Sequence, residues 1–140
     1  MTRPRIFITQ PVARRAIERL QAVAEVAWNP DPLRILSKRE LLDAVRGADY
    51  LFCLLQDVVD RDVIAANPAL KMIASMTIIP ADIDMAAATA ARIPVTVIPP
   101  IVTEATADLA FALLLAVARR VAEADRLVKA GTFPGSQSQY

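Results

Sequence analysis

Histidine is absent from the 140 residues, and glycine and cysteine are scarce. Without an imidazole, the chain by itself cannot use histidine as a general base or as a metal ligand. The three glycines, Gly47, Gly131 and Gly135, cannot form a glycine-rich dinucleotide loop or a phosphate-binding P-loop. The single cysteine, Cys53, excludes an internal disulfide and a cysteine-cluster metal site. Its apolar neighbours predict a buried, unreactive thiol.

Charge and hydropathy place the chain among globular proteins of one domain. Sixteen Lys and Arg against fifteen Asp and Glu give a net charge of +1, which offers no electrostatic basis for binding nucleic acid or a membrane surface. Hydrophobic residues make up 55% of the chain, enough for a sizeable core. No apolar stretch reaches the roughly 18 residues of a membrane span, and the first apolar run is too short for a signal peptide. We therefore expect a cytoplasmic protein, which suits the reduced state of a lone cysteine.

Short apolar runs alternate with segments of helical pattern. Runs typical of strands cover residues 5–9, 25–28, 50–55, 71–75 and 94–98. Helical spacing and capping patterns predict helices within residues 13–24, 37–47, 60–67 and 83–91. This alternation predicts an α/β fold, a flavodoxin-like three-layer sandwich around a five-stranded parallel sheet. Ligands of such sheets bind at the carboxyl ends of the strands.

The last third of the chain has a different pattern. Residues 104–130 contain nothing that breaks a helix, so they predict one long exit helix of about 40 Å. Its first half is nearly all apolar, and we expect that half to be packed on most sides. Residues 131–140 have the composition of turns and predict an irregular tail.

Four carboxylates lie near the ends of predicted strands: Asp57, Asp60, Asp82 and Asp84. Paired carboxylates can serve as a general acid and base. The alternative interpretation, which we favour, is that Asp60 and Asp84 cap helices and that Asp82 lies in a solvated loop. A receiver-type phosphoacceptor site is not expected, because no acid follows the first predicted strand.

Motifs along the whole chain are similar to those of one enzyme family. They are ADYLFCLLQD at residues 48–57, NPALKMIAS at 67–75, IDMAAATAARIPVT at 83–96 and VTEATADLAFALLLAVARR at 102–120. Together they resemble the D-isomer-specific 2-hydroxyacid dehydrogenases, near the glyoxylate and hydroxypyruvate reductase branch. The resemblance implies a flavodoxin-like substrate domain, discontinuous in sequence, and a Rossmann-type domain that binds NAD or NADP.

The resemblance also implies how this chain is divided. Residues 1–100 would form the substrate-binding (catalytic) domain, residues 101–130 the linker helix that begins the NAD-binding domain, and residues 131–140 an irregular tail. The family transfers hydride between nicotinamide and a small 2-oxo or 2-hydroxy acid. Its Arg, its His–Glu pair and its glycine-rich loop would all follow Tyr140. We therefore expect NAD or NADP in the complete protein, no tight cofactor binding to this chain, and no activity of this chain alone.

Four residues correspond to family positions at the site. Leu55 would line the substrate pocket, the loop containing Ile78 and Ile79 would bind the substrate carboxylate through backbone N–H groups, and Thr106 would lie near the nicotinamide. No catalytic residue and no metal ligand is expected in this chain. Ile79 stands where the family has glycine, and the following Pro80 favours extended conformations at Ile79, so the loop is altered.

Three functions remain open on this basis. The chain is the substrate-binding part of a dehydrogenase, a naturally short, non-enzymatic paralogue that acts as an oligomerisation or binding module, or a full-length relative with an unusual substrate that no longer needs the glycine loop. Without a second domain, Phe111, Leu114 and Leu115 would be exposed. An exposed apolar surface of this kind drives association. We therefore expect a homodimer or another self-associated form through the long helix.

Overall fold

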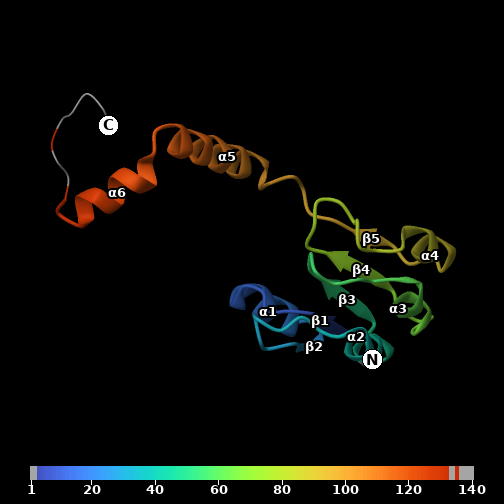
Figure 1. Cartoon of the computed structure of the whole chain (residues 1–140). Coiled ribbons are helices and arrows are strands. Elements are labelled where there is room, and N and C mark those ends of the chain that lie inside the picture. Colours follow the sequence, from blue (N-terminus) through green and yellow to red (C-terminus); the bar gives the residue numbers. More distant parts are fainter. Residues whose placement is uncertain (1–2, 133–134, 136–140) are drawn as a thin grey trace. The chain divides into compact units, whose positions relative to one another are not determined.

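The computed structural model describes residues 3–132 and Gly135. The chain divides into two compact units, Met1–Pro99 and Pro100–Tyr140. The first unit is built on a five-stranded sheet of order β2-β1-β3-β4-β5 (Figure 1). All four strand pairs are parallel, as the alternating pattern predicts. The strands are β1 (Arg5–Ile8), β2 (Glu25–Trp28), β3 (Tyr50–Cys53), β4 (Met72–Ser75) and β5 (Val95–Thr96).

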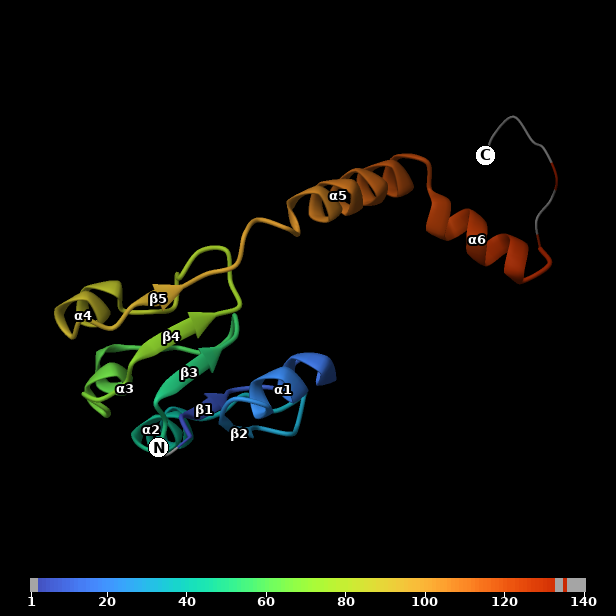
Figure 2. The same ribbon diagram turned by 180° about the vertical axis from the view of Figure 1, so that it is seen from behind.

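Four helices connect these strands and cover the two faces of the sheet. They are α1 (Arg14–Gln21), α2 (Lys38–Arg46), α3 (Arg61–Ala65) and α4 (Met85–Ala90). Figures 1 and 2 show α1 on one face of the sheet and α2, α3 and α4 on the other. The predicted three-layer sandwich is therefore confirmed, with an α/β fold and a five-stranded parallel sheet.

The hydrophobic core lies between the sheet and the layer of α2, α3 and α4. Alternate residues of a strand point to the same face, so β3 contributes Leu51 and Cys53 and β4 contributes Ile73. The facing helices contribute residues that are also buried: Leu41 and Val45 of α2, Val63 and Ile64 of α3, and Ala88 of α4. Cys53 is 1% exposed, which confirms the predicted burial of the thiol.

The opposite face of the sheet is less completely covered. Tyr50, Phe52, Met72 and Ala74 point to this face from β3 and β4 and are only half-buried. Beside them and α1 lies a groove of about 440 Å³. Among the helices of the first unit, α1 is the one on this face.

The ends of the elements follow from local hydrogen bonds. Ser37 and Glu40 form the predicted capping box, in which the Ser37 hydroxyl accepts the Glu40 N–H and the Glu40 carboxylate accepts the Ser37 N–H. The strand expected over residues 50–55 stops at Cys53, because the N–H of Leu54 donates to the Asp57 carboxylate rather than to a neighbouring strand. The strand expected over residues 94–98 is likewise shorter, because only residues 95 and 96 pair with β4.

The second unit contains two helices, α5 (Thr103–Ala118) and α6 (Val121–Lys129). The expectation of one continuous helix over residues 104–130 is therefore wrong at one point. Arg120 adopts a left-handed conformation with φ of 52°, which ends the first helix. Its guanidinium then pairs with Glu123 in the first turn of α6, at 2.6 and 2.8 Å.

The apolar side chains of α5 are exposed, contrary to the expectation that this half is packed on most sides. Their exposed fractions range from 58% to 78% for Leu109, Phe111, Leu113, Leu114, Leu115 and Val117. In the described part of the chain no helix combines the length and the apolar character needed to cross a bilayer. Most of the tail expected over residues 131–140 lies outside the described residues.

Candidate functional site

Leu55, Ile78 and Ile79 lie at the carboxyl edge of the sheet, where the pattern of a parallel α/β fold places ligands. Leu55 follows β3, and Ile78 and Ile79 follow β4. The two strands are neighbours and end in register, with Cys53 opposite Ser75. The structure thus brings the three predicted substrate-binding residues of this unit to adjacent loops.

Backbone hydrogen bonds hold these loops together beyond the strands. The N–H of Met76 donates to the carbonyl of Cys53 at 2.9 Å. Further on, Val59 and Ile83 form an isolated parallel bridge, in which the N–H of Val59 donates to the Asp82 carbonyl at 2.8 Å. The Ile98 N–H donates to the Thr77 carbonyl at 3.0 Å, which joins the segment after β5 to the same edge.

Three consecutive backbone N–H groups of the loop after β4 lack an acceptor. They belong to Thr77, Ile78 and Ile79, and no atom of residues 3–132 accepts a hydrogen bond from them. The chain has no Lys or Arg between residues 72 and 91. Within this loop, the groups available to an anion are therefore backbone amides.

The loop accommodates isoleucine without a left-handed backbone. The described non-glycine residues of positive φ are Arg92 and Arg120, so Ile79 is not among them. The Ile79 side chain is 70% exposed and Leu55 is 68% exposed, so both project from the edge. The isoleucine at position 79 therefore does not require a left-handed backbone, and it adds an exposed apolar side chain to the loop.

A buried carboxylate joins the end of β1 to the loop after β3. Asp57 is 4% exposed and Thr9 is fully buried. One oxygen of Asp57, Oδ2, accepts a hydrogen bond from the Thr9 hydroxyl and another from the Leu54 N–H, the latter at 2.7 Å. This carboxylate faces neutral donors, and it lies under the loop that presents Leu55.

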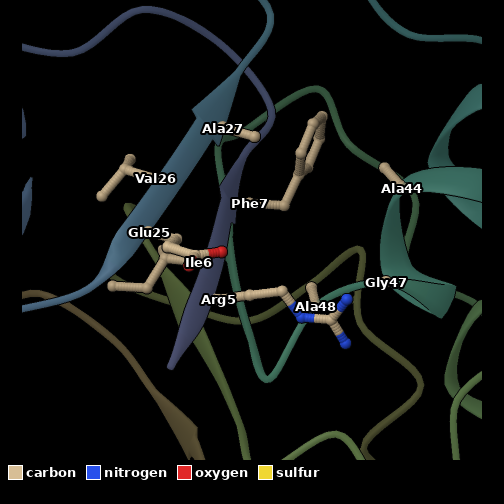
Figure 3. Close-up of a pocket in the computed structure, with 9 residues that line it drawn as sticks. All are labelled: Arg5, Ile6, Phe7, Glu25, Val26, Ala27, Ala44, Gly47 and Ala48. Carbon is tan, nitrogen blue, oxygen red and sulfur yellow. The ribbon is translucent and has the colours of Figure 1, made fainter. Parts of the chain in front are cut away.

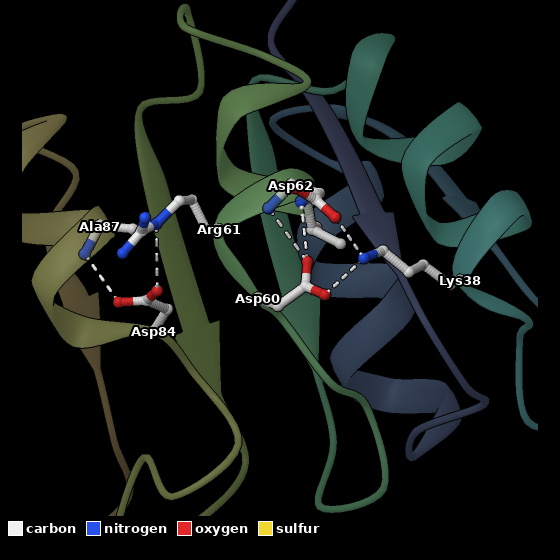
Figure 4. Close-up of polar contacts among 7 residues, drawn as sticks. Lys38, Asp60, Arg61, Asp62, Asp84 and Ala87 are labelled. Carbon is white, nitrogen blue, oxygen red and sulfur yellow. Dashed lines mark hydrogen bonds and ion pairs between the residues drawn. The ribbon is translucent and has the colours of Figure 1, made fainter.

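The other carboxylates near strand ends have structural roles. Asp60 caps α3 by accepting the N–H groups of Asp62 and Val63, and Asp84 caps α4 by accepting the N–H of Ala87 (Figure 4). Both caps were predicted, and Asp82 is exposed in its loop as expected. These contacts support the interpretation of Asp60 and Asp84 as helix caps.

Figure 4 also shows that ion pairs connect the amino ends of the three helices of this layer. Lys38 of α2 pairs with Asp60 at 2.7 Å and with Asp62 of α3. Arg61 of α3 lies 3.8 Å from Asp84, the cap of α4. The hydrogen bond from Lys38 holds the pKa of the Asp60 carboxyl below its ordinary value.

The cysteine at this edge is buried and holds its proton tightly. Cys53 is the last residue of β3, and burial raises the pKa of its thiol to about 11. At neutral pH the group is therefore a thiol, and a thiol is a poor nucleophile compared with a thiolate.

A separate pocket of about 360 Å³ lies at the other end of the sheet (Figure 3). Its lining includes Arg5 and Glu25, which begin β1 and β2, and Gly47, which ends α2. Because ligands of parallel sheets bind at the carboxyl ends of strands, this pocket is not the candidate site.

Thr106, the residue predicted to lie near the cofactor, belongs to the second unit. It sits in the first turn of α5 and is exposed. Its hydroxyl donates to the carbonyl of Val102 at 2.7 Å, so the oxygen remains able to accept a hydrogen bond.

Sequence reasoning did not find the contact between Thr9 and Asp57. The two residues are 48 positions apart, and only the pairing of β1 with β3 brings them together. A usable signal was present, since each is a polar residue within a few positions of the end of an apolar strand.

Comparisons with known proteins agree with this architecture. The model of the D-isomer specific 2-hydroxyacid dehydrogenase catalytic domain matches residues 6–132. A glyoxylate reductase of Thermococcus litoralis is 40% identical over 135 residues, which are 96% of this chain and 40% of that protein. A glyoxylate reductase of Aeropyrum pernix is 41% identical over 135 residues, 94% of this chain and 39% of that protein.

Among solved structures, the TT0316 protein from Thermus thermophilus matches with a TM-score of 0.85 and 36% identity. The match covers 96% of this chain and 43% of that one. The chain thus spans about two fifths of the length of these relatives. With the family model matching nearly its whole length, the chain belongs to the D-isomer specific 2-hydroxyacid dehydrogenase family.

Proposed function

We propose that this chain is the substrate-binding portion of an NAD(P)-dependent D-2-hydroxyacid dehydrogenase. The complete protein would transfer hydride between nicotinamide and a small 2-oxo or 2-hydroxy acid. One observation carries the proposal: the unpaired N–H groups of Thr77, Ile78 and Ile79 lie at the carboxyl edge of the sheet, next to the loop that presents Leu55. Successive backbone N–H groups can form an anion-binding concavity, and we assign the substrate carboxylate to these three.

In this proposal the loop after β4 fixes the carboxylate end of the substrate. Ile78 and Ile79 contribute their N–H groups, and the exposed side chains of Leu55 and Ile79 provide apolar walls. Because apolar walls exclude water, they strengthen the amide–carboxylate interaction. This chain therefore binds and orients the substrate and leaves the proton transfer to residues outside it.

The residues present here do not form a cradle for a dinucleotide. The chain has three glycines, and none lies in a βα turn of the sheet. Thr106 is the one residue that we assign to the nicotinamide side of the site. Because this chain also lacks histidine, we propose that it binds no cofactor tightly and is inactive alone.

Amide chemical shifts test the carboxylate site directly. Oxamate, a non-reducible analogue of a 2-oxo acid, is added to the ¹⁵N-labelled chain, with equimolar chloride as the control. The amide signals of Thr77, Ile78 and Ile79 are expected to shift with oxamate alone. Shifts confined to other regions, or equal shifts with chloride, would contradict the site.

Activity tests the rest of the proposal. The complete natural protein is expected to oxidise NADH or NADPH in the presence of glyoxylate, hydroxypyruvate or another 2-oxo acid, and residues 1–140 are expected not to. Turnover by a chain of 15.2 kDa, verified by intact mass, would refute the assignment of catalysis to residues outside it. We expect the same protein to be cytoplasmic.

A second candidate, a non-enzymatic binding or oligomerisation module, is favoured by the exposed apolar side chains of α5. Phe111 is 69% exposed and Leu114 is 61% exposed. Under either function we propose a homodimer or other self-association through this helix. Sedimentation of the chain should show association that Phe111→Asp weakens, whereas Thr89→Asp on α4 serves as the matched control. A monomeric wild-type chain at high concentration would refute this part.

A further inference from the structure

The buried carboxylate of Asp57, at the edge of the sheet, is not one of the groups that contact the substrate in the proposed site. Asp57 Oδ2 accepts hydrogen bonds from the Thr9 hydroxyl and from the Leu54 N–H. The Asp57 N–H in turn donates to the Leu54 carbonyl at 3.2 Å. Two hydrogen bonds therefore close the turn at residues 54–57, one between backbone groups and one to the Asp57 side chain.

The turn is also anchored to a different strand. The Thr9 N–H donates to the carbonyl of Phe52 at 3.0 Å, and Thr9 follows β1 directly. Its hydroxyl therefore has a fixed position in the core from which it reaches Asp57. Leu55 and Gln56, at the tip of the turn, remain exposed, and their N–H groups have no acceptor within residues 3–132.

Burial of this carboxylate is a costly way to close a turn. A buried carboxylate without a cation depends on the hydrogen bonds that it accepts, and Asp57 accepts them from a hydroxyl and an amide. A turn can be closed by an uncharged side chain or by the backbone alone. The arrangement therefore points to a requirement for one precise loop conformation rather than for stability.

We propose that Thr9 and Asp57 are positioning residues, which hold residues 54–57 in the conformation that presents Leu55 to the substrate. This inference rests on the proposed function of the edge. Neither residue touches the substrate. Both act through the loop, so their loss should weaken the binding of the 2-oxo acid more than it slows turnover.

Three variants separate the contributions to this contact. Thr9→Val removes the hydroxyl and keeps the shape of the side chain. Asp57→Ala removes the acceptor, and Asp57→Asn retains one oxygen that can accept both hydrogen bonds. Asn67→Ala serves as the matched control, because Asn67 is also a buried polar residue. Its side chain donates to the carbonyls of Val45 and Ala48, away from the site.

Two measurements test the role of the contact between Thr9 and Asp57. In the 140-residue chain, amide hydrogen exchange at Leu54 is expected to rise at least tenfold in Thr9→Val and Asp57→Ala and to stay near the wild-type rate in Asp57→Asn. In the complete natural protein, the KM for the 2-oxo acid is expected to rise at least fivefold in the first two variants. Their kcat and their KM for the nicotinamide cofactor should stay within twofold of wild type, and Asp57→Asn should restore the KM.

The control distinguishes positioning from general stability. Asn67→Ala is expected to lower the melting temperature and leave the KM for the 2-oxo acid unchanged. Unchanged exchange at Leu54, or an unchanged KM in Thr9→Val, would overturn the inference. Failure of the wild-type protein to reduce any 2-oxo acid would instead overturn the proposed function. The exchange at Leu54 would then still decide whether these two residues hold the loop.

Discussion

Arg92 occupies a backbone position that suits glycine. It follows α4 with φ of 57°, in the left-handed region. Its N–H donates to the Thr89 carbonyl at 3.0 Å, and the N–H of Ile93 donates to the Ala88 carbonyl at 2.9 Å. This is the Schellman motif, in which the residue after the helix cap is left-handed and is usually glycine. We predict that Arg92→Gly stabilises the protein.

The magnitude follows from two opposing effects. A left-handed conformation costs a non-glycine residue roughly 1–2 kcal/mol. Glycine makes the unfolded chain more flexible, which costs about 0.5–1 kcal/mol. The Arg92 side chain is exposed and has no hydrogen bond or ion pair with any described residue, so its removal loses no contact. The net gain is about 0.5–1 kcal/mol, or a rise of roughly 2–4 °C in melting temperature.

Urea unfolding followed by circular dichroism measures this gain. The urea concentration at the midpoint of unfolding should rise, and the slope of the unfolding free energy against urea concentration should stay unchanged. Arg92→Ala is the matched control, because alanine removes the same side chain and retains the β-carbon that disfavours the left-handed region. We expect the glycine variant to be the most stable of the three proteins and the alanine variant to stay near wild type. If Arg92→Gly is no more stable than Arg92→Ala, the assignment of backbone strain to this residue is refuted.

Three further results are expected. Asn67→Ala should cost about 2–3 kcal/mol in the free energy of unfolding, because two carbonyls lose a buried donor; thermal melts measure this loss. Lys38→Met should lower stability at pH 6, since the Asp60 carboxyl has a depressed pKa when folded. The difference should shrink as the pH falls below about 4, where that carboxyl becomes protonated, and a set of melts across pH would show it. Cys53 should react with a thiol reagent at pH 8 far more slowly in the native protein than in urea, because its thiol pKa is about 11.

The sequence predicts those parts of the structure that depend on residues close together along the chain. The apolar run of β3 and the capping box at Ser37 and Glu40 are local patterns, and the structure contains both. The break at Arg120 could not be predicted, because no glycine or proline marks it. An arginine there bears the strain of the left-handed backbone itself.

The candidate site depends more on topology. Leu55, Ile78 and Ile79 could be placed at one edge because residues that follow parallel strands meet there. The link from Thr9 to Asp57 could not, because it requires the order of the strands, with β1 next to β3. The conformation of Ile79 was also beyond sequence reasoning, which could only compare an isoleucine with the glycine of the family.

The brevity of β5 has a consequence for how this molecule behaves in a crowded solution. An unpaired outer strand offers a row of free N–H and C=O groups to which another chain can add. Here the outer strand on the β5 side pairs only at Val95 and Thr96. Pro94 precedes it, and Pro99 and Pro100 follow shortly after, none of which has an N–H to donate. The edge strand on this side of the sheet is therefore too short, and has too few backbone N–H donors, to act as a template for fibrous aggregation.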